Sequence, residues 1–141
     1  DVTVVGTGAT TYSSKSGYPV KADVAAEQVT ADDFDGIIIP GGYAPDLMRR
    51  SPAMVKLVKD AILGGKVVGA ICHAAWVLCS AGVLEGKTAT CFHSIKDDLV
   101  NAGARYVDQE VVVDGNLITA REAKDLPAFC RALIYLLEKA D

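Results

Sequence analysis

The sequence predicts a single α/β domain with a mostly parallel sheet. Two short apolar runs, Gly36–Ile39 and Val67–Ile71, carry no charge, which is typical of strands buried on both faces. Each run is followed by a turn and then a helical pattern, and such alternation is characteristic of α/β proteins. The chain of 141 residues is long enough for one domain with a sizeable core. We find no linker or repeat and assign residues 1–141 to one domain.

Composition excludes several classes of protein. The chain has 14 basic and 18 acidic residues and no basic patch with interleaved aromatic residues, so nucleic acid is not expected as a partner. The uncharged run Val67–Leu84 is of marginal length for a membrane span, but Gly69, His73 and Gly82 interrupt it, so no membrane is expected either. No signal peptide is evident at the N-terminus, which favours a cytoplasmic protein.

The four cysteines lack the paired spacing of zinc sites. We therefore expect free thiols in a reducing compartment, with no metal site and no cofactor. Cys79 and Cys130 are expected to pack in the interior, whereas the pattern leaves open whether Cys91 lies near a site.

The first 35 residues predict short elements. Val2–Val5 is expected to form a strand, Thr11–Gly17 a loop, and Tyr18–Val24 an edge strand or hairpin arm. The glycines of Gly6–Thr10 resemble a dinucleotide loop only weakly, because no third glycine and no helical pattern follow. A polar connection is the better interpretation. Thr30 is expected to cap a helical turn.

The strand at Gly36–Ile39 runs into Pro40-Gly41-Gly42. Two glycines allow a tight turn with uncovered amide N–H groups, and ligands of open parallel sheets bind at such strand ends. Ser51 and Pro52 then predict the start of a helix. Six apolar residues at helical spacing are expected to face the core: Met54, Val55, Leu57, Val58, Ile62 and Leu63.

The second strand predicts a reactive thiol. Val67–Ile71 meets Cys72-His73 and continues as Ala74–Leu78, which favours a helix. A cysteine at a sharp strand-to-helix turn stands clear of the sheet, beside free backbone N–H groups at the positive end of a helix dipole. The alternative is a buried structural cysteine, because free cysteine is among the most buried residue types.

The last 54 residues continue the alternation. We expect a strand at Thr88–Phe92, a helix capped by Ser94 and ending at Val100, and a hairpin over Glu110–Thr119. Arg121 is expected to pair with an acid or to structure a subunit contact, and Asp125 to cap the last helix. The residues of that helix expected to face inward are Phe129, Leu133, Ile134, Leu136 and Leu137.

The ordered motifs resemble the ThiJ/PfpI superfamily, and within it the intracellular protease and general-stress-protein branch. The matching segments are Ile38–Asp46 with Arg49 and Arg50, Ala70–His73, Ser80–Leu84, Asn101–Ala104, Val111–Asp114, Leu117–Arg121 and Asp125–Phe129. The resemblance implies a flavodoxin-like three-layer sandwich. It implies Cys72 as nucleophile, His73 as its base, and an oxyanion hole made by the Gly42 and His73 amides.

The resemblance also implies that the oligomer takes part in catalysis. Asp46 matches an acid, commonly Glu, that in the protease branch reaches the histidine of a neighbouring subunit. A homo-oligomer, from dimer to hexamer, is therefore expected as the partner of this chain. Asp is one methylene shorter than Glu, which would loosen the contact with His73.

The chain departs from the family pattern in two further places. Ala74-Ala75-Trp76 stands where the family usually has Gly, which would narrow the pocket. Tyr43, Ala74, Trp76 and His93 are therefore candidate pocket residues, although His93 fits a surface or loop-packing role equally well. The first strand and helix of the family, about 30 residues, appear absent from this sequence, and a sheet without them would expose an apolar edge.

Three functions follow from the resemblance. The first is a PfpI-like cysteine peptidase or hydrolase of the stress response. The second is a glyoxalase or protein deglycase that acts on methylglyoxal or its adducts, so the expected substrate is a peptide or a small aldehyde. The third is a redox-sensing or chaperone-like stress protein without enzymatic activity, with Cys72 oxidised. A glutamine amidotransferase is excluded because no His-x-Glu follows Cys72.

Overall fold

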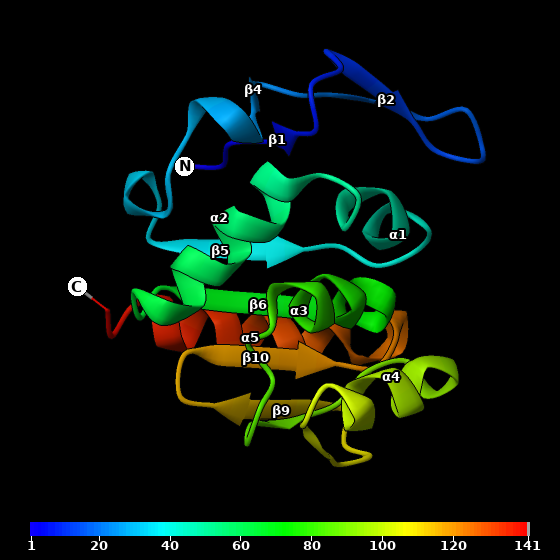
Figure 1. Ribbon diagram of the computed structural model, residues 1–141, viewed down its shortest axis with the longest axis vertical. Helices are drawn as coiled ribbons and strands as arrows, with labels where there is room; N and C mark the ends of the chain where they lie inside the picture. The colour runs from blue at the N-terminus through cyan, green and yellow to red at the C-terminus, as the bar shows by residue number, and fades with distance from the viewer. Residues whose placement is uncertain (141) are drawn as a thin grey trace.

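A four-stranded sheet forms the centre of the computed structural model, which describes residues 1–140 (Figure 1). The strand order is β5-β6-β10-β9. These strands span Gly36–Ile39 in β5, Val67–Ile71 in β6, Leu117–Ala120 in β10 and Val111–Asp114 in β9. The first three strands are parallel, and β9 pairs antiparallel with β10 through the predicted hairpin. The expectation of a mostly parallel sheet is confirmed.

Helices cover both faces of this sheet. Helices α2 (Pro52–Leu63) and α3 (Ala75–Ala81) lie on one face, and α5 (Leu126–Leu137) lies on the other (Figure 1). Along β6 the side chains alternate. Val68 and Ala70 belong to the core cluster with α2 and α3, whereas alternate positions face α5. This arrangement confirms the three-layer α/β fold.

The α5 face packs unusually close to β6 at Gly69. A Cβ atom at this position would lie 2.7 Å from Leu133 Cδ2 and 2.9 Å from Phe129 Cζ. Two apolar residues predicted to face inward are instead exposed, Leu63 by 71% and Ile134 by 56%. Each directly follows a buried residue on its helix, and one helical step turns the side chain by about 100°. These two core predictions were wrong for that reason.

The N-terminal segment forms two small pairs of strands. Strand β1 (Val5–Gly6) pairs parallel with β4 (Val24–Ala25). Strand β2 (Thr11–Ser13) pairs antiparallel with β3 (Pro19–Lys21). The expected loop over residues 11–17 was thus wrong at its start. The Tyr12 hydroxyl accepts hydrogen bonds from the amides of residues 7 and 9 at 2.6 and 3.1 Å, which anchors β2 to the glycine loop.

In the described part of the chain, β5 is hydrogen-bonded to a neighbouring strand on one side only, where it pairs with β6. The small β1–β4 pair lies beyond the other side of β5 as a separate unit (Figure 1). The side chain of Ile38 is 59% exposed. The sheet therefore presents an apolar residue on its edge strand.

Four further short elements complete the described fold. They are α1 (Ala44–Met48), β7 (Thr88–Ala89), α4 (Lys96–Asn101) and β8 (Arg105–Tyr106), with β7 and β8 paired in parallel. Single 3₁₀ turns occupy Ala26–Gln28, Ala31–Asp33, Cys72–Ala74, His93–Ile95 and Ala123–Asp125. No helix within residues 1–140 has the length and apolar character that crossing a membrane requires.

The predicted helix caps had different outcomes. Ser51 caps α2, because its hydroxyl accepts a hydrogen bond from the Met54 amide at 3.3 Å. Ser94 does not cap α4. It lies inside the preceding 3₁₀ turn, and α4 begins two residues later. The hydroxyl of Ser94 is therefore available for a different contact.

Candidate active site

Cys72 lies where β6 ends and the chain turns sharply. Its φ is +63°, and within residues 1–140 it is the one non-glycine residue with positive φ. This conformation is costly for a residue with a side chain, and such residues cluster at functional sites. A short 3₁₀ turn and α3 follow directly. The predicted strand-to-helix turn at Cys72 is confirmed.

The loop after β5 lies against Cys72. Because β5 and β6 are parallel neighbours, their C-terminal ends meet at the same edge of the sheet. A Cβ atom at Gly41 would lie 2.7 Å from Cys72 Cβ and 3.4 Å from its Sγ. Gly42, with φ of +75°, continues the turn. Glycine at position 41 thus permits the approach of this loop to the thiol.

His73 contacts a polar group through each ring nitrogen. Nδ1 lies 3.3 Å from Cys72 Sγ, although the two residues are adjacent in the chain. Nε2 lies 3.3 Å from the hydroxyl oxygen of Ser94. Both Cys72 and His73 are half-buried. The predicted thiol and base are therefore in contact, and a third polar residue joins them.

Two aromatic side chains hold the imidazole between them. The Phe92 ring stacks on the His73 ring at a centroid distance of 5.0 Å and an angle of 30°. Trp76 meets it edge-on at 5.1 Å and 69°. The indole N–H of Trp76 donates a hydrogen bond to Asp98 at 2.8 Å, which fixes this ring. The His73 ring is consequently restricted in orientation as well as in position.

The other predicted site residues have different surroundings. Asp46 lies on α1 and forms an ion pair with Arg50, two residues beyond the end of that helix. Among residues 1–140, the polar side chains bonded to His73 are Cys72 and Ser94, and Asp46 is not one of them. Tyr43 precedes α1 and is 68% exposed, whereas Ala74 is fully buried in the core cluster.

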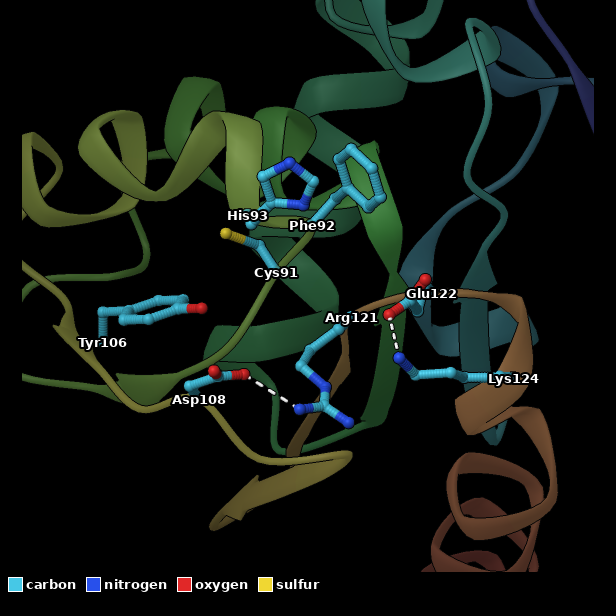
Figure 2. A pocket seen from close by; sticks show the side chains of 8 residues that line it. All are labelled: Cys91, Phe92, His93, Tyr106, Asp108, Arg121, Glu122 and Lys124. Atoms are coloured by element: carbon cyan, nitrogen blue, oxygen red, sulfur yellow. Dashed lines mark hydrogen bonds and ion pairs between the residues drawn. The ribbon is translucent and has the colours of Figure 1, made fainter.

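A cavity of about 210 Å³ adjoins the segment that carries Phe92 (Figure 2). It is lined by Cys91, Phe92, His93, Tyr106, Asp108, Arg121, Glu122 and Lys124. Of the four predicted pocket residues, His93 lines this cavity. The Phe92 side chain both borders the cavity and stacks on His73.

The cations of the cavity are paired with acids. Arg121 Nε and Nη2 donate to the Asp125 carboxylate at 2.9 and 3.1 Å, and Nη1 donates to Asp108 at 2.9 Å. These hydrogen bonds raise the pKa of Arg121 and lower the pKa of Asp125, which is 2% exposed. The prediction that Arg121 pairs with an acid is confirmed. Asp125 is the N-cap residue of α5, as predicted, but its carboxylate makes no capping hydrogen bond because it is engaged with Arg121.

The remaining cysteines lack this geometry. Cys91 is 1% exposed, and burial raises its pKa to about 12, so its thiol stays protonated at neutral pH. Burial also raises the pKa of Cys79, which packs against the core as predicted. Cys130 was expected to pack inside but is exposed on α5, because the inward face of this helix is carried by Phe129 and Leu133.

Sequence reasoning missed Ser94 and Phe92 as parts of this site. Ser94 was assigned to a helix cap because serine before a helical pattern commonly caps it. Phe92 was expected only as the end of a strand. The available signal was their position beside His93, after a short strand whose end points to the same edge of the sheet.

Comparison with known proteins identifies the family of the chain. The model of the DJ-1/PfpI family matches residues 1–136. A deglycase of Pyrococcus abyssi is 44% identical over 126 residues, which cover 89% of this chain and 76% of the relative. YraA of Bacillus subtilis, named as a candidate cysteine protease, is 44% identical over 126 residues, covering 89% and 75%.

A solved structure shares the fold. A two-domain protein of Anabaena variabilis, with a DJ-1/ThiJ/PfpI-like and a ferritin-like domain, matches with a TM-score of 0.88 and 46% identity. The match covers 91% of this chain and 37% of that longer protein. Family match, sequence identity and fold agree, and the chain belongs to the DJ-1/PfpI family.

Proposed function

We propose that the chain is part of a cysteine-dependent enzyme with Cys72 as nucleophile. The observation that carries this proposal is the Cys72 elbow, where a residue with positive φ places its Sγ 3.3 Å from His73 Nδ1. A thiol beside an oriented base is the general design of an activated nucleophile. Within residues 1–140, the thiols of Cys91 and Cys130 form no hydrogen bond with a histidine.

The proposed chemistry begins with one proton transfer and one addition. His73 Nδ1 takes the thiol proton, and the thiolate forms an S–C bond with a carbonyl carbon of the substrate. The carbonyl π electrons move to its oxygen, which becomes an oxyanion. We propose that the Gly42 and His73 amides stabilise this charge, since the Gly41-Gly42 loop lies against the thiol.

The substrate we favour is an adduct of a small aldehyde such as methylglyoxal. The name deglycase, carried by the Pyrococcus abyssi relative, supports this choice. Peptide hydrolysis is the second candidate and is supported by the name of the Bacillus subtilis relative. In that reaction the same thiolate attacks an amide, His73 protonates the departing amine, and water hydrolyses the thioester.

One parallel experiment separates these candidates. Wild type, Cys72→Ala and the matched control Cys130→Ala are assayed for lactate release from methylglyoxal-treated N-acetylarginine and for cleavage of a peptide amide. We expect Cys72→Ala to form lactate at least about 100-fold more slowly than wild type, because the nucleophile is removed. Cys130→Ala should form lactate at the wild-type rate. Cleavage of the peptide amide alone would favour the peptidase.

Two results would contradict the proposed enzyme. Full activity of Cys72→Ala on both substrates would show that Cys72 is not the nucleophile. No activity of the wild type on either, together with ready peroxide oxidation of Cys72 to sulfenic or sulfinic acid, would instead favour the redox-sensing function.

We also propose that the protein acts as a homo-oligomer in which Asp46 approaches His73 of a neighbouring subunit. The support is the family resemblance and the position of Asp46 on α1, where its carboxylate is partly exposed beside Arg50. Both nitrogens of the His73 ring already have partners within the chain. An incoming carboxylate would therefore share or displace the contact at Nε2.

A further inference from the structure

The geometry points to Ser94 as a positioning residue for His73. This inference rests on the proposed function, because it concerns how the base of Cys72 is prepared. Ser94 Oγ lies 3.3 Å from His73 Nε2, on the side of the ring opposite to the contact between Nδ1 and Cys72 Sγ. The hydroxyl oxygen of Ser94 accepts a hydrogen bond from Nε2–H and so holds the ring in the form with a free Nδ1.

The argument follows from the chemistry of imidazole. Neutral imidazole carries one proton, and the nitrogen without it is the one that can accept. For His73 to take the thiol proton, Nδ1 must be free and Nε2 must carry the hydrogen. Once the thiol proton has moved to Nδ1, both ring nitrogens are donors and the ring is positively charged. A hydrogen bond from Nε2–H then stabilises the ring more strongly than it does the neutral form. Ser94 Oγ is placed to serve in both states.

Ser94 is held in place by the segment around it. The amide of Phe92 donates to the Cys72 carbonyl at 3.3 Å, which ties this segment to the elbow. The amide of Ile95 donates to the Phe92 carbonyl at 3.1 Å and closes the turn that contains Ser94. Phe92 fixes the plane of the imidazole by stacking, and the Ser94 hydroxyl forms a hydrogen bond with its Nε2 atom. One short segment therefore controls both the orientation and the protonation of the base.

The test measures the alkylation of Cys72 by iodoacetamide between pH 5 and pH 9, with the site of modification confirmed by peptide mass mapping. We expect Ser94→Ala to lower the rate at pH 7 by about 3- to 10-fold, the value of a single hydrogen bond, and to move the midpoint of the profile to higher pH. Ser94→Thr keeps the hydroxyl and should restore the rate to within about twofold.

Controls separate positioning from folding and from the neighbouring subunit. Ser16→Ala removes a hydroxyl from an exposed turn and should leave the profile unchanged. The protein has two histidines, so ¹⁵N-histidine NMR with His93→Gln for assignment reports the His73 tautomer directly. We expect the Nε2–H form in wild type and a mixture of forms in Ser94→Ala.

Several outcomes would overturn the inference. A Ser94→Ala profile and tautomer equal to wild type would do so, as would failure of Ser94→Thr to rescue. A shift caused by Asp46→Asn and absent from Ser94→Ala would assign the role to a carboxylate of a neighbouring subunit. Alkylation needs no turnover, so the result stands apart from the assays of lactate release and peptide cleavage.

Discussion

At the scale of single residues, the site depends on backbone positions that few side chains tolerate. Cys72 accepts a positive φ, and Gly41 allows the neighbouring loop to reach it. The Cys72–His73 contact joins residues adjacent in sequence, which is unusual because neighbouring side chains generally diverge. The turn at Cys72 and the aromatic side chains around His73 bring the two together.

Gly41→Ala should lower the reactivity of the Cys72 thiol. The added Cβ would lie 2.7 Å from Cys72 Cβ and 3.0 Å from the Ile71 carbonyl oxygen, and one of these groups must move. We expect the rate of Cys72 alkylation at pH 7 to fall by about tenfold or more, as displacements of about 1 Å at active sites commonly do. Circular dichroism should show a folded protein.

A second background makes this prediction specific. In Cys72→Gly the Cβ of residue 72 is gone, so adding Gly41→Ala should cost less stability there than in wild type, as measured by urea denaturation. An equal cost in both backgrounds would contradict the proposed clash with Cys72.

At the scale of elements, the boundaries predicted from sequence hold where local signals decide them. The uncharged runs became β5 and β6 with the expected bounds, and Ser51 caps α2. Ser94 does not cap α4, and Asp125 occupies the N-cap position of α5 without a capping hydrogen bond; both side chains contact other partners in the fold. The local preference of a serine or aspartate for capping a helix is overridden when its side chain forms a more favourable tertiary contact.

The contact of Asp125 with Arg121 should stabilise the junction of β10 and α5. Asp125 is nearly buried and accepts two hydrogen bonds from Arg121. Asp125→Asn should therefore lower the free energy of unfolding by about 2 kcal/mol, because it leaves buried polar groups poorly matched. Chemical denaturation followed by fluorescence of Trp76 measures this change.

The matched control is the exposed pair of Lys56 and Asp60 on α2. Asp60→Asn should change the unfolding free energy by less than about 0.5 kcal/mol, since exposed helical ion pairs contribute little. Equal changes in unfolding free energy for the two substitutions would show that the contact of Asp125 with Arg121 stabilises the fold no more than an exposed ion pair does.

At the scale of the whole molecule, carboxylates join parts of the chain that are distant in sequence. Asp114 at the end of β9 accepts a hydrogen bond from the Thr88 amide at 2.7 Å. Arg121 joins Asp108, before β9, to Asp125 at the start of α5. Hydrogen bonds from Thr88 and Arg121, respectively, lower the pKa values of Asp114 and Asp125.

These two carboxylates predict sensitivity to acid. A carboxylate with a lowered pKa in the fold stabilises it at pH values above the unfolded pKa of about 3.9. That contribution is lost as the pH falls through the lower folded value. The urea midpoint should therefore be nearly constant from pH 7 to about pH 5 and drop below about pH 4.

Urea denaturation of wild type and Asp125→Asn across pH 7 to 2.5 measures this dependence. The variant has one of the two groups removed, so its midpoint should fall less steeply with acid than that of wild type. Parallel curves for the two proteins would argue against a role for Asp125 in acid lability.

The amino-acid sequence by itself determined the α/β class, the central strands, the elbow cysteine and the adjacent histidine. Local patterns of hydrophobicity, turn residues and motif spacing predict each of these features. Only the tertiary structure decided which groups surround His73, where Asp46, Asp125 and Ser94 direct their side chains, and which face of α5 is buried. Those outcomes depend on contacts between segments far apart in the chain, and local sequence patterns carry no information about which distant partner a polar side chain will meet.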